Sequence, residues 1–249
     1  MIKVTVITAT WNSEATIADT LKSLASQSYS NIEYLVIDGA SKDGTLDIVK
    51  EQGDRVSKLV SEQDKGIYDA LNKGIAMATG DVIGFLHSDD LFADADVVSK
   101  IAQAFEDSSV DAVYGDLDYV SKENTERVIR RWVSGHYNRK NIRNGWMPPH
   151  PSFYMRRAHY QRLGGFDLNY RIAADYDSIL RYLWTNKLSA KYIPKVFIKM
   201  RVGGESNRSL RNILRKTQED KKAMHANELP FMRALLGKNF SKIPQFFKR

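Results

Sequence analysis

Short runs of β-branched and apolar residues alternate with helical patterns through the first 115 residues, and this order constrains the fold most strongly. Apolar runs of strand length occupy residues 3–8, 32–38, 56–61 and 82–86. Between the first two, Ile17, Leu21 and Leu24 recur at spacings of four and three, as on one face of a helix. Alternating strands and helices predict an α/β fold, with βαβ units around a mostly parallel sheet flanked by helices.

The remaining elements complete one α/β domain with a C-terminal helical extension. Further helices are predicted to begin at about residue 45, and at residues 68–78 and 94–105, with another strand at 112–114. Residues 117–133 have the pattern of an antiparallel ribbon, and a polar stretch follows at residues 134–151. We find no internal repeat, low-complexity tract or clear linker, so a second independent domain is not predicted.

Charge is distributed unevenly along the chain. The 249 residues carry a formal net charge of +7, but residues 199–249 hold 13 Lys and Arg against 4 Asp and Glu. Residues 1–198 therefore hold 24 basic against 26 acidic residues, a net charge of −2. The body is nearly neutral, and the basic character belongs to the tail.

Cysteine and long apolar segments are both missing from the sequence. With no cysteine, the chain has no disulfide framework, thiolate nucleophile or Cys-ligated metal site. The first ten residues do not have the pattern of a signal peptide, and no window approaches the roughly 20 apolar residues of a membrane span. We therefore expect a cytoplasmic protein.

Acidic residues follow two of the predicted strands. Asp38 ends the second strand, and Asp89 and Asp90 follow the fourth. Ligands of open α/β sheets bind at the carboxyl ends of strands, where adjacent carboxylates suit Mg²⁺ or Mn²⁺. The alternative is that Asp90 or Asp94 only caps the next helix.

The loop at residues 38–44 (DGASKDG) connects a buried strand to a helix. Its glycines allow close approach of a ligand, and the helix start offers free amide groups. A plain connection with an Asp helix cap remains open. Neither a dinucleotide-binding GxGxxG motif nor a phosphate-binding GxxxxGK[ST] motif is present.

Four motifs occur in order in the first half of the chain: residues 8–12 (TATWN), 36–45 (VIDGASKDGT), 62–74 (EQDKGIYDALNKG) and 87–90 (HSDD). Together they resemble family 2 glycosyltransferases, which are inverting, nucleotide-sugar-dependent enzymes of GT-A fold. The resemblance continues through residues 164–167 (GGFD), 173–177 (AADYD) and 203–206 (GGES). It implies a GT-A domain at residues 1–207, with a nucleotide-sugar half at 1–115 and an acceptor half at 116–207.

The resemblance also implies roles for individual residues on the donor side. Asp38 matches the acid that hydrogen-bonds the base, Asp89 faces the ribose or sugar, and Asp90 is the direct ligand of Mn²⁺ or Mg²⁺. The other positions implied to contact or adjoin the nucleotide are Thr8, Thr10, Asn12, Lys65, Asp69 and Asn72. In residues 87–90, Ser and His stand where relatives often carry Asp or Asn, which leaves the metal with few protein carboxylates.

On the acceptor side, Asp175 matches the general base that removes the proton of the acceptor hydroxyl. The alternative is that Asp175 caps the following helix. His150 is either a contact to the donor diphosphate or acceptor, or a histidine of a rigid turn. Arg201 lies at the start of a glycine-containing loop that closes on the diphosphate in relatives.

The resemblance implies transfer of a hexose from a nucleotide diphosphate sugar, with UDP as the expected nucleotide, to a saccharide or lipid-linked saccharide in bacterial surface polysaccharide synthesis. Residues 208–249 form a basic helical tail that either contacts an anionic membrane surface or packs on the core. A sugar nucleotidyltransferase is disfavoured because no Gly-rich, basic triphosphate loop follows the first strand. The near-neutral body disfavours a nucleic-acid-binding protein.

Overall fold

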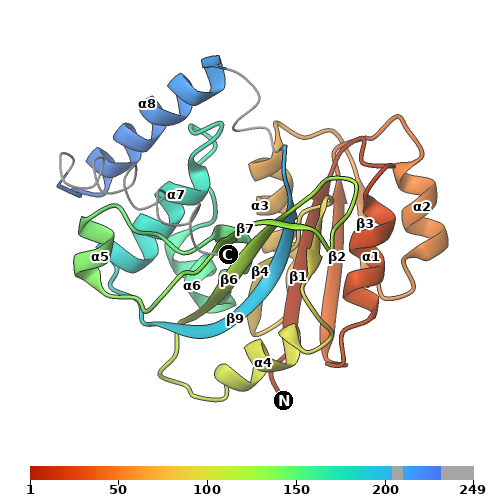
Figure 1. Cartoon of the computed structure of the whole chain (residues 1–249), viewed down its shortest axis with the longest axis horizontal. Coiled ribbons are helices and arrows are strands. Elements are labelled where there is room, and N and C mark those ends of the chain that lie inside the picture. Colours follow the sequence, from red (N-terminus) through yellow and green to blue (C-terminus); the bar gives the residue numbers. More distant parts are fainter. Residues whose placement is uncertain (204–209, 231–249) are drawn as a thin grey trace.

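A computed structural model describes residues 1–203 and 210–230, and within them a nine-stranded sheet has helices on both faces (Figure 1). In chain order the elements are β1 (Val4–Thr10), α1 (Ile17–Ala25), β2 (Ile32–Asp38), α2 (Thr45–Gln52), β3 (Lys58–Ser61), α3 (Ile67–Met77), β4 (Val82–Phe85), β5 (Asp90–Phe92), α4 (Val97–Ala104), β6 (Ala112–Val120), β7 (Val128–Trp132), α5 (Arg139–Arg143), η1 (His150–Ser152), β8 (Tyr154–Arg156), α6 (Arg157–Leu163), α7 (Ala174–Ile179), η2 (Leu180–Thr185), β9 (Ala190–Arg201) and α8 (Leu210–Ala226).

The amino-terminal half of the sheet is parallel, as predicted. Its strands lie in the order β3-β2-β1-β4, and all three pairings are parallel. In the register of β1 and β2, Thr10 lies opposite Asp38. The carboxyl ends of these strands therefore meet at one edge, where polar loop residues gather.

The other half of the sheet is mixed rather than parallel. β4 and β6 both pair antiparallel with β8, β6 runs parallel to β9, and β5 pairs antiparallel with β9. The ribbon predicted at residues 117–133 is confirmed by the antiparallel pairing of β6 and β7, with Leu117 opposite Trp132. β5, β8 and β9 were not predicted.

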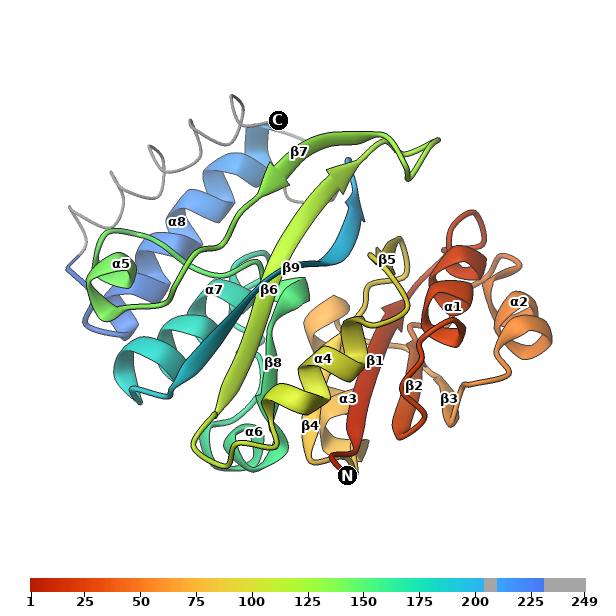
Figure 2. The same ribbon diagram turned by 60° about the horizontal axis from the view of Figure 1, so that its bottom comes forward.

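Strand alternation divides the apolar core between the two faces of the sheet. On β1, Val4 and Val6 pack with α1, α2 and α4, whereas Ile7 and Ala9 pack with α3, α6, α7 and α8. Figure 2 looks onto the face that α4 covers, with α3 behind the sheet. The predicted α/β layering is thus confirmed, because the central strands β1, β2 and β4 are buried from both sides.

Helix α8 packs on the core through one face and leaves the other exposed. Ala223, Met224 and, beyond the helix, Leu229 belong to the core cluster that contains α7. Asn227 donates to the Asp177 carboxylate of α7 at 3.0 Å. Figure 1 shows α8 lying over α7, at the opposite end of the molecule from α2. Among residues 1–203 and 210–230, no helix combines the length and apolarity that crossing a bilayer requires.

Candidate active site

A pocket of about 480 Å³ opens at the carboxyl ends of the parallel strands. The pocket is lined by residues from the ends of β1 and β2, from the segment before α3, from α3 itself and from the loop after β4. These residues are Ala9, Thr10, Trp11, Ser13, Gly39, Gln63, Asp64, Gly66, Ile67, Ala70 and Ser88. This is the edge where an open α/β sheet binds its ligand. The volume lies within the range of small-molecule sites.

The β1 end shapes one wall of this pocket. Asn12 has a left-handed backbone (φ 47°), and its side-chain oxygen accepts a hydrogen bond from the Lys42 amide at 2.9 Å. Thr10 lines the pocket, and its hydroxyl is buried without a hydrogen-bond partner in the described part of the chain. Thr8 is not among the residues that line this pocket: it is fully buried, and its hydroxyl donates to the Leu86 carbonyl at 2.6 Å.

Asp38 supports the pocket from behind instead of facing a base. Its side chain is fully buried, and its carboxylate accepts from the Ser41 amide at 3.0 Å, the Ser61 hydroxyl at 2.6 Å and the Ser41 hydroxyl. The acidic side chain that lines the pocket is Asp64, which was not predicted. A Cβ on Gly39 would lie 2.5 Å from Asp64 Oδ2, so the absence of a side chain there leaves room for this carboxylate.

The predicted contacts on and before α3 are mostly structural. The Lys65 amide donates to Asp69 at 3.0 Å, and Asp69 also lies 3.7 Å from the Lys73 ammonium. Asn72 clamps the main chain of Phe166, whose amide and carbonyl each lie 2.8 Å from its side-chain amide. Asp69 and Asn72 thus hold the loops around the site, and the pocket is lined by Ile67 and Ala70 of the same helix.

Asp90 is the most unusual carboxylate of the strand-end edge. It is 1% exposed, and neither carboxylate oxygen has a hydrogen-bond partner within residues 1–203 and 210–230. Burial, and secondly the charge of Asp89, raises the pKa of Asp90 well above its usual value. Buried acceptors left without donors are rare, so this carboxylate is suited to a cation.

Arg201 stands beside the same pair of acids. It is the last residue of β9, and its guanidinium donates to the Asp89 carbonyl at 2.8 Å and to the Asp19 carboxylate of α1. The charge of Arg201 partly opposes the rise in the pKa of Asp90. The structure therefore brings together Asp89, Asp90 and Arg201, which are up to 112 residues apart in sequence.

Asp175 lies in the first turn of α7, within reach of two rings. Its Oδ2 is 3.1 Å from His150 Nδ1, and its Oδ1 is 3.3 Å from the Tyr68 hydroxyl, which donates more closely to the Ile172 carbonyl at 2.7 Å. The carboxylate is 19% exposed. Asp175 is not the helix cap, because Ala173 holds the N-cap position of α7 and Asp175 lies in its first turn. Glu219 of α8 accepts from the amides of Ile172 and Ala173 just before the helix.

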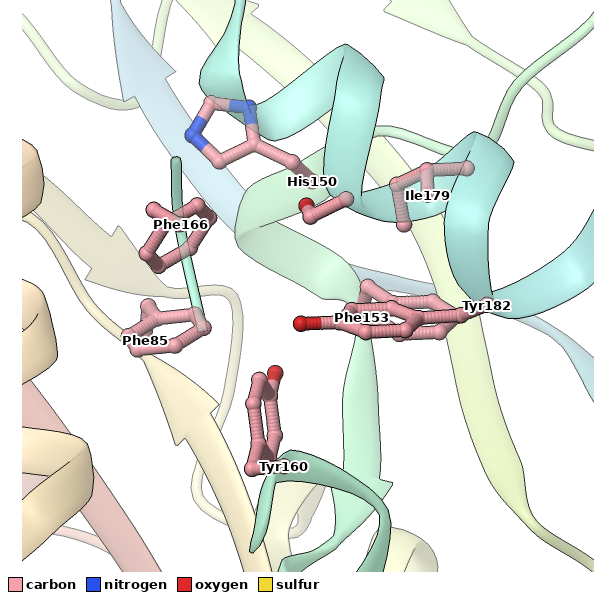
Figure 3. A pocket seen from close by; sticks show the side chains of 8 residues that line it. Phe85, His150, Phe153, Tyr160, Phe166, Ile179 and Tyr182 are labelled. Carbon is pink, nitrogen blue, oxygen red and sulfur yellow. The ribbon is translucent and has the colours of Figure 1, made fainter. Parts of the chain in front are cut away.

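His150 is in turn paired with His87. The two Nε2 atoms lie 2.9 Å apart, and burial followed by the charge of His150 lowers the pKa of His87 to about 3. Below His150, Figure 3 shows the aromatic wall of a cavity of about 10 Å³, which has room for one water at most. His150 thus begins the η1 turn, as one of its two interpretations from the sequence predicts, and it also contacts Asp175, which neither interpretation included.

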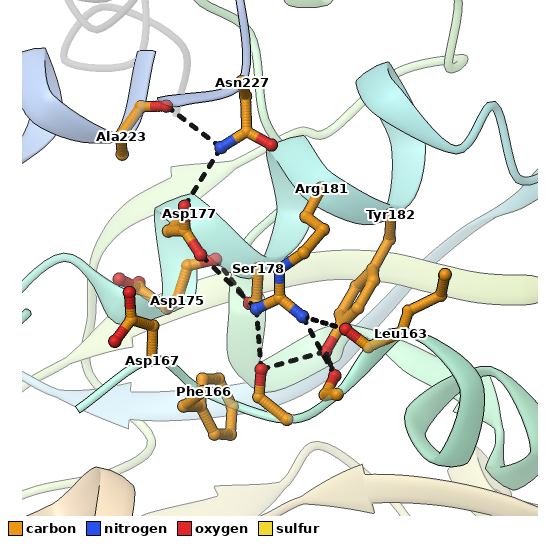
Figure 4. Close-up of polar contacts among 12 residues, drawn as sticks. Leu163, Phe166, Asp167, Asp175, Asp177, Ser178, Arg181, Tyr182, Ala223 and Asn227 are labelled. Atoms are coloured by element: carbon orange, nitrogen blue, oxygen red, sulfur yellow. Dashed lines mark hydrogen bonds and ion pairs between the residues drawn. The ribbon is translucent and has the colours of Figure 1, made fainter. Parts of the chain in front are cut away.

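Asp177 has a structural role on the same helix. Its carboxylate accepts from Arg181 at 3.3 Å and from Asn227 at 3.0 Å, as Figure 4 shows. Arg181 also donates to the carbonyls of residues 163–165, the loop that carries the Gly-Gly motif. Asp177 and Arg181 therefore fix the loop around Asp175, and Asp175 remains the acid of this helix that faces the histidines.

Comparison with known proteins identifies the family. The model of glycosyl transferase family 2 matches residues 5–164. An uncharacterized glycosyltransferase of Mycobacterium tuberculosis is 34% identical over 179 residues, which cover 72% of this chain and 68% of the relative. A PGL/p-HBAD biosynthesis glycosyltransferase of Mycobacterium bovis is 31% identical over 208 residues, which cover 81% of this chain and 78% of the relative.

Solved structures share the fold at lower identity. A mannosyltransferase of Pyrobaculum calidifontis in complex with GDP-Man and Mn²⁺ gives a TM-score of 0.69 at 21% identity, covering 98% of this chain and 72% of that one. TarS of S. aureus in complex with UDP-GlcNAc gives 0.68 at 19% identity, covering 94% of this chain and 69% of that one. The family model spans more than half of this chain, and the curated relatives exceed 30% identity over more than two thirds of it. The protein is therefore a glycosyltransferase and belongs to glycosyl transferase family 2.

Proposed function

We propose that this glycosyltransferase moves a hexose from a nucleotide diphosphate sugar, UDP-linked, to a hydroxyl of a saccharide or lipid-linked saccharide in bacterial surface polysaccharide synthesis, with inversion at the anomeric carbon. The observation that carries the proposal is the placement of the 480 Å³ pocket beside Asp89 and Asp90. Ser88 lines the pocket directly before these acids, and its hydroxyl lies 2.9 Å from that of Ser13.

The nucleoside is assigned to the pocket at the ends of β1 and β2. Trp11 and Ile67 offer exposed apolar surface there, 65% and 47% exposed, against which a base can pack. Asp64 lines the same wall and is the carboxylate placed to accept from a base N–H, in place of Asp38. Lys65, Asp89 and Arg201 supply polar and cationic groups toward the ribose and diphosphate.

Asp90 fits a divalent cation, Mn²⁺ or Mg²⁺. Its two buried oxygens lack donors within the described residues, and those residues contain no cluster of three or more potential ligands. Such a site suits a metal whose remaining ligands are diphosphate oxygens and water. When bound, the cation stabilises the negative charge of the departing diphosphate.

Asp175 is proposed as the general base. It would accept the proton of the acceptor hydroxyl while that oxygen bonds to the anomeric carbon and the bond to the nucleotide diphosphate breaks on the opposite side. Tyr68 supports this arrangement, because it follows Ile67 of the donor pocket and its own hydroxyl reaches Asp175.

Thermal unfolding with a panel of donors tests the proposed function. We expect UDP or one UDP-sugar to raise the melting temperature in the presence of Mn²⁺ or Mg²⁺ and much less in their absence. A donor at about 100 times its Kd would stabilise the fold by about 2.7 kcal/mol. If GDP-mannose were the only donor that stabilised the protein, the donor nucleotide would be GDP and not UDP. No metal-dependent stabilisation by any nucleotide diphosphate sugar would contradict the proposal.

The exposed face of α8 is proposed to contact an anionic membrane that presents the acceptor, at the cytoplasmic leaflet. Leu214 and Ile213 are 66% and 46% exposed, and Arg215 and Lys216 follow them on the helix. Apolar residues beside basic ones favour the interface of an anionic bilayer, with about 1 kcal/mol for each Lys or Arg near the surface.

Sedimentation with vesicles containing phosphatidylglycerol tests this surface. Leu214→Asp should reduce the bound fraction, because it removes apolar contact and adds a repelled charge, and Ile129→Asp on the 54%-exposed Ile129 of β7 is the matched control. We use point substitutions because truncation before α8 would remove Ala223 and Met224 from the core. Equal binding by both variants and the unmodified protein would contradict the membrane contact.

A further inference from the structure

Three residues that are distant in sequence form a continuous row of close polar contacts. His87 follows β4, His150 begins η1 and Asp175 lies in α7. The row runs from His87 Nε2 to His150 Nε2 over 2.9 Å and from His150 Nδ1 to Asp175 Oδ2 over 3.1 Å. The two imidazole centroids are 5.2 Å apart with their planes tilted by 58°. Both nitrogens of His150 are therefore engaged, one by an acid and one by a second histidine.

The chemistry of these atoms determines where the protons lie. An ionised carboxylate offers no proton, so the 3.1 Å approach of His150 Nδ1 to Asp175 Oδ2 is favourable when His150 Nδ1 carries the proton. If His150 is neutral, its Nε2 accepts, and His87 Nε2 must be the donor. His87 Nδ1 is then an unprotonated nitrogen, buried and without a partner in the described part of the chain. The opposite arrangement would leave a buried N–H unpaired there, which is less tolerated than an unpaired acceptor.

We propose that His87 and His150 are positioning residues for the Asp175 base: His87 holds His150 as the Nδ1–H tautomer, and His150 holds the Asp175 carboxylate in a fixed orientation. This inference rests on the proposed function of Asp175. His150 contacts Oδ2 and the Tyr68 hydroxyl contacts Oδ1, so the carboxylate is held from two sides. Fixing a reacting group in one orientation lowers the entropic part of its barrier.

Substitution of each histidine by Asn or by Gln provides a test, because the two side chains place their amide N–H donor at different positions. The amide nitrogen of Asn matches His Nδ1 in position, and that of Gln matches Nε2. At residue 150 we therefore expect His150→Asn to retain a donor to Asp175 and His150→Gln to lose it. At residue 87 we expect His87→Gln to retain the donor to His150 and His87→Asn to lose it, since only Nε2 of His87 contacts His150. A residue needed only to fill space would not show this exchange.

Turnover is measured as release of nucleotide diphosphate from the donor that stabilises the unmodified protein with Mn²⁺. We expect kcat of His150→Gln to be at least about tenfold below that of His150→Asn, and kcat of His87→Asn to be below that of His87→Gln, with KM for the donor nearly constant. His159→Gln is the control, because His159 forms a similar 2.7 Å pair with Asp111 outside this row. Equal kcat for the Asn and Gln variants at residue 150 would overturn the inference.

Nitrogen NMR gives a second measurement that does not depend on turnover. The chain has five histidines, so a long-range ¹H–¹⁵N spectrum of histidine-labelled protein resolves their tautomers. We expect His150 as Nδ1–H and His87 as Nε2–H, and a loss of the single His150 tautomer in His87→Asn. Finding His150 as Nε2–H would overturn the inference. A protein that neither binds nor cleaves any nucleotide sugar would contradict the proposed function instead, while the spectrum would still show whether His87 and His150 hold these tautomers.

Discussion

Replacing Asp175 with Asn should lower turnover by about 10²- to 10⁴-fold while leaving the affinity for donor and metal close to that of the unmodified protein. The amide keeps the shape of the carboxylate, and its oxygen can still accept from His150 Nδ1, which lies 3.1 Å from Asp175 Oδ2 in the unmodified protein. The amide cannot take a proton. General-base removal accounts for a loss of this size. Steady-state release of nucleotide diphosphate, together with donor titration by calorimetry, separates the two effects.

Asp177→Asn is the matched control for this substitution. Asp177 lies two residues further on the same helix and accepts from Arg181 and Asn227. Its loss should lower the melting temperature through the weakened contact with α8 and change kcat little. Near-normal turnover in Asp175→Asn would remove Asp175 from the base role, and a larger loss in Asp177→Asn would transfer that role to Asp177.

Replacing Asp90 with Asn should have opposite effects on the free and the ligand-bound protein. Without ligand, the melting temperature should rise at neutral pH, because a neutral amide costs less to bury than a carboxylate whose pKa burial has raised. A pKa that is higher in the folded protein destabilises the fold as pH rises above the unfolded value, so the gain should shrink at acid pH. With Mn²⁺ and donor, the stabilisation of the unmodified protein should be lost.

Asp94→Asn provides the comparison for Asp90. Asp94 is four residues further along, and its carboxylate is paired with Lys195 at 2.8 Å near the surface. Its loss should leave metal-dependent stabilisation intact. Retention of that stabilisation in Asp90→Asn would show that Asp90 does not hold the metal.

The parallel half of the fold was predictable because its signals are local. β2 and α3 have continuous apolar runs or regular helical spacing, and their observed bounds lie within a residue or so of the expected ones. β9 carries Pro194 and three internal lysines, which obscure a strand pattern, and its pairing with β6 shifts register in that region. Proline in a sheet is tolerated at such irregularities. β8 has three residues and is defined only by its neighbours.

The site was predictable in its residue types and less so in its contacts. The strand pattern predicted acids at the strand ends, and Asp90 is buried there with no hydrogen-bond partner for its carboxylate among the described residues. The sequence could not show that the hydroxyls of Ser41 and Ser61 donate to the Asp38 carboxylate, because Ser61 lies on β3, 23 residues further along the chain. His87 was noted only as a departure from the usual motif. Its partner lies 63 residues away, at a distance that no local spacing encodes.

The two hydrogen bonds that Glu219 accepts from the segment before α7 bear on how this enzyme can be recombined with its relatives. The family model ends at residue 164, whereas the proposed base and the helix α8, which carries Glu219, both lie beyond that point. A hybrid enzyme joined between residues 203 and 210 would separate the two, and the amides of Ile172 and Ala173 would lose their acceptor. An exchange of acceptor specificity between relatives should therefore transfer residues 165–230 as one block, because α8 holds the segment that precedes the proposed base.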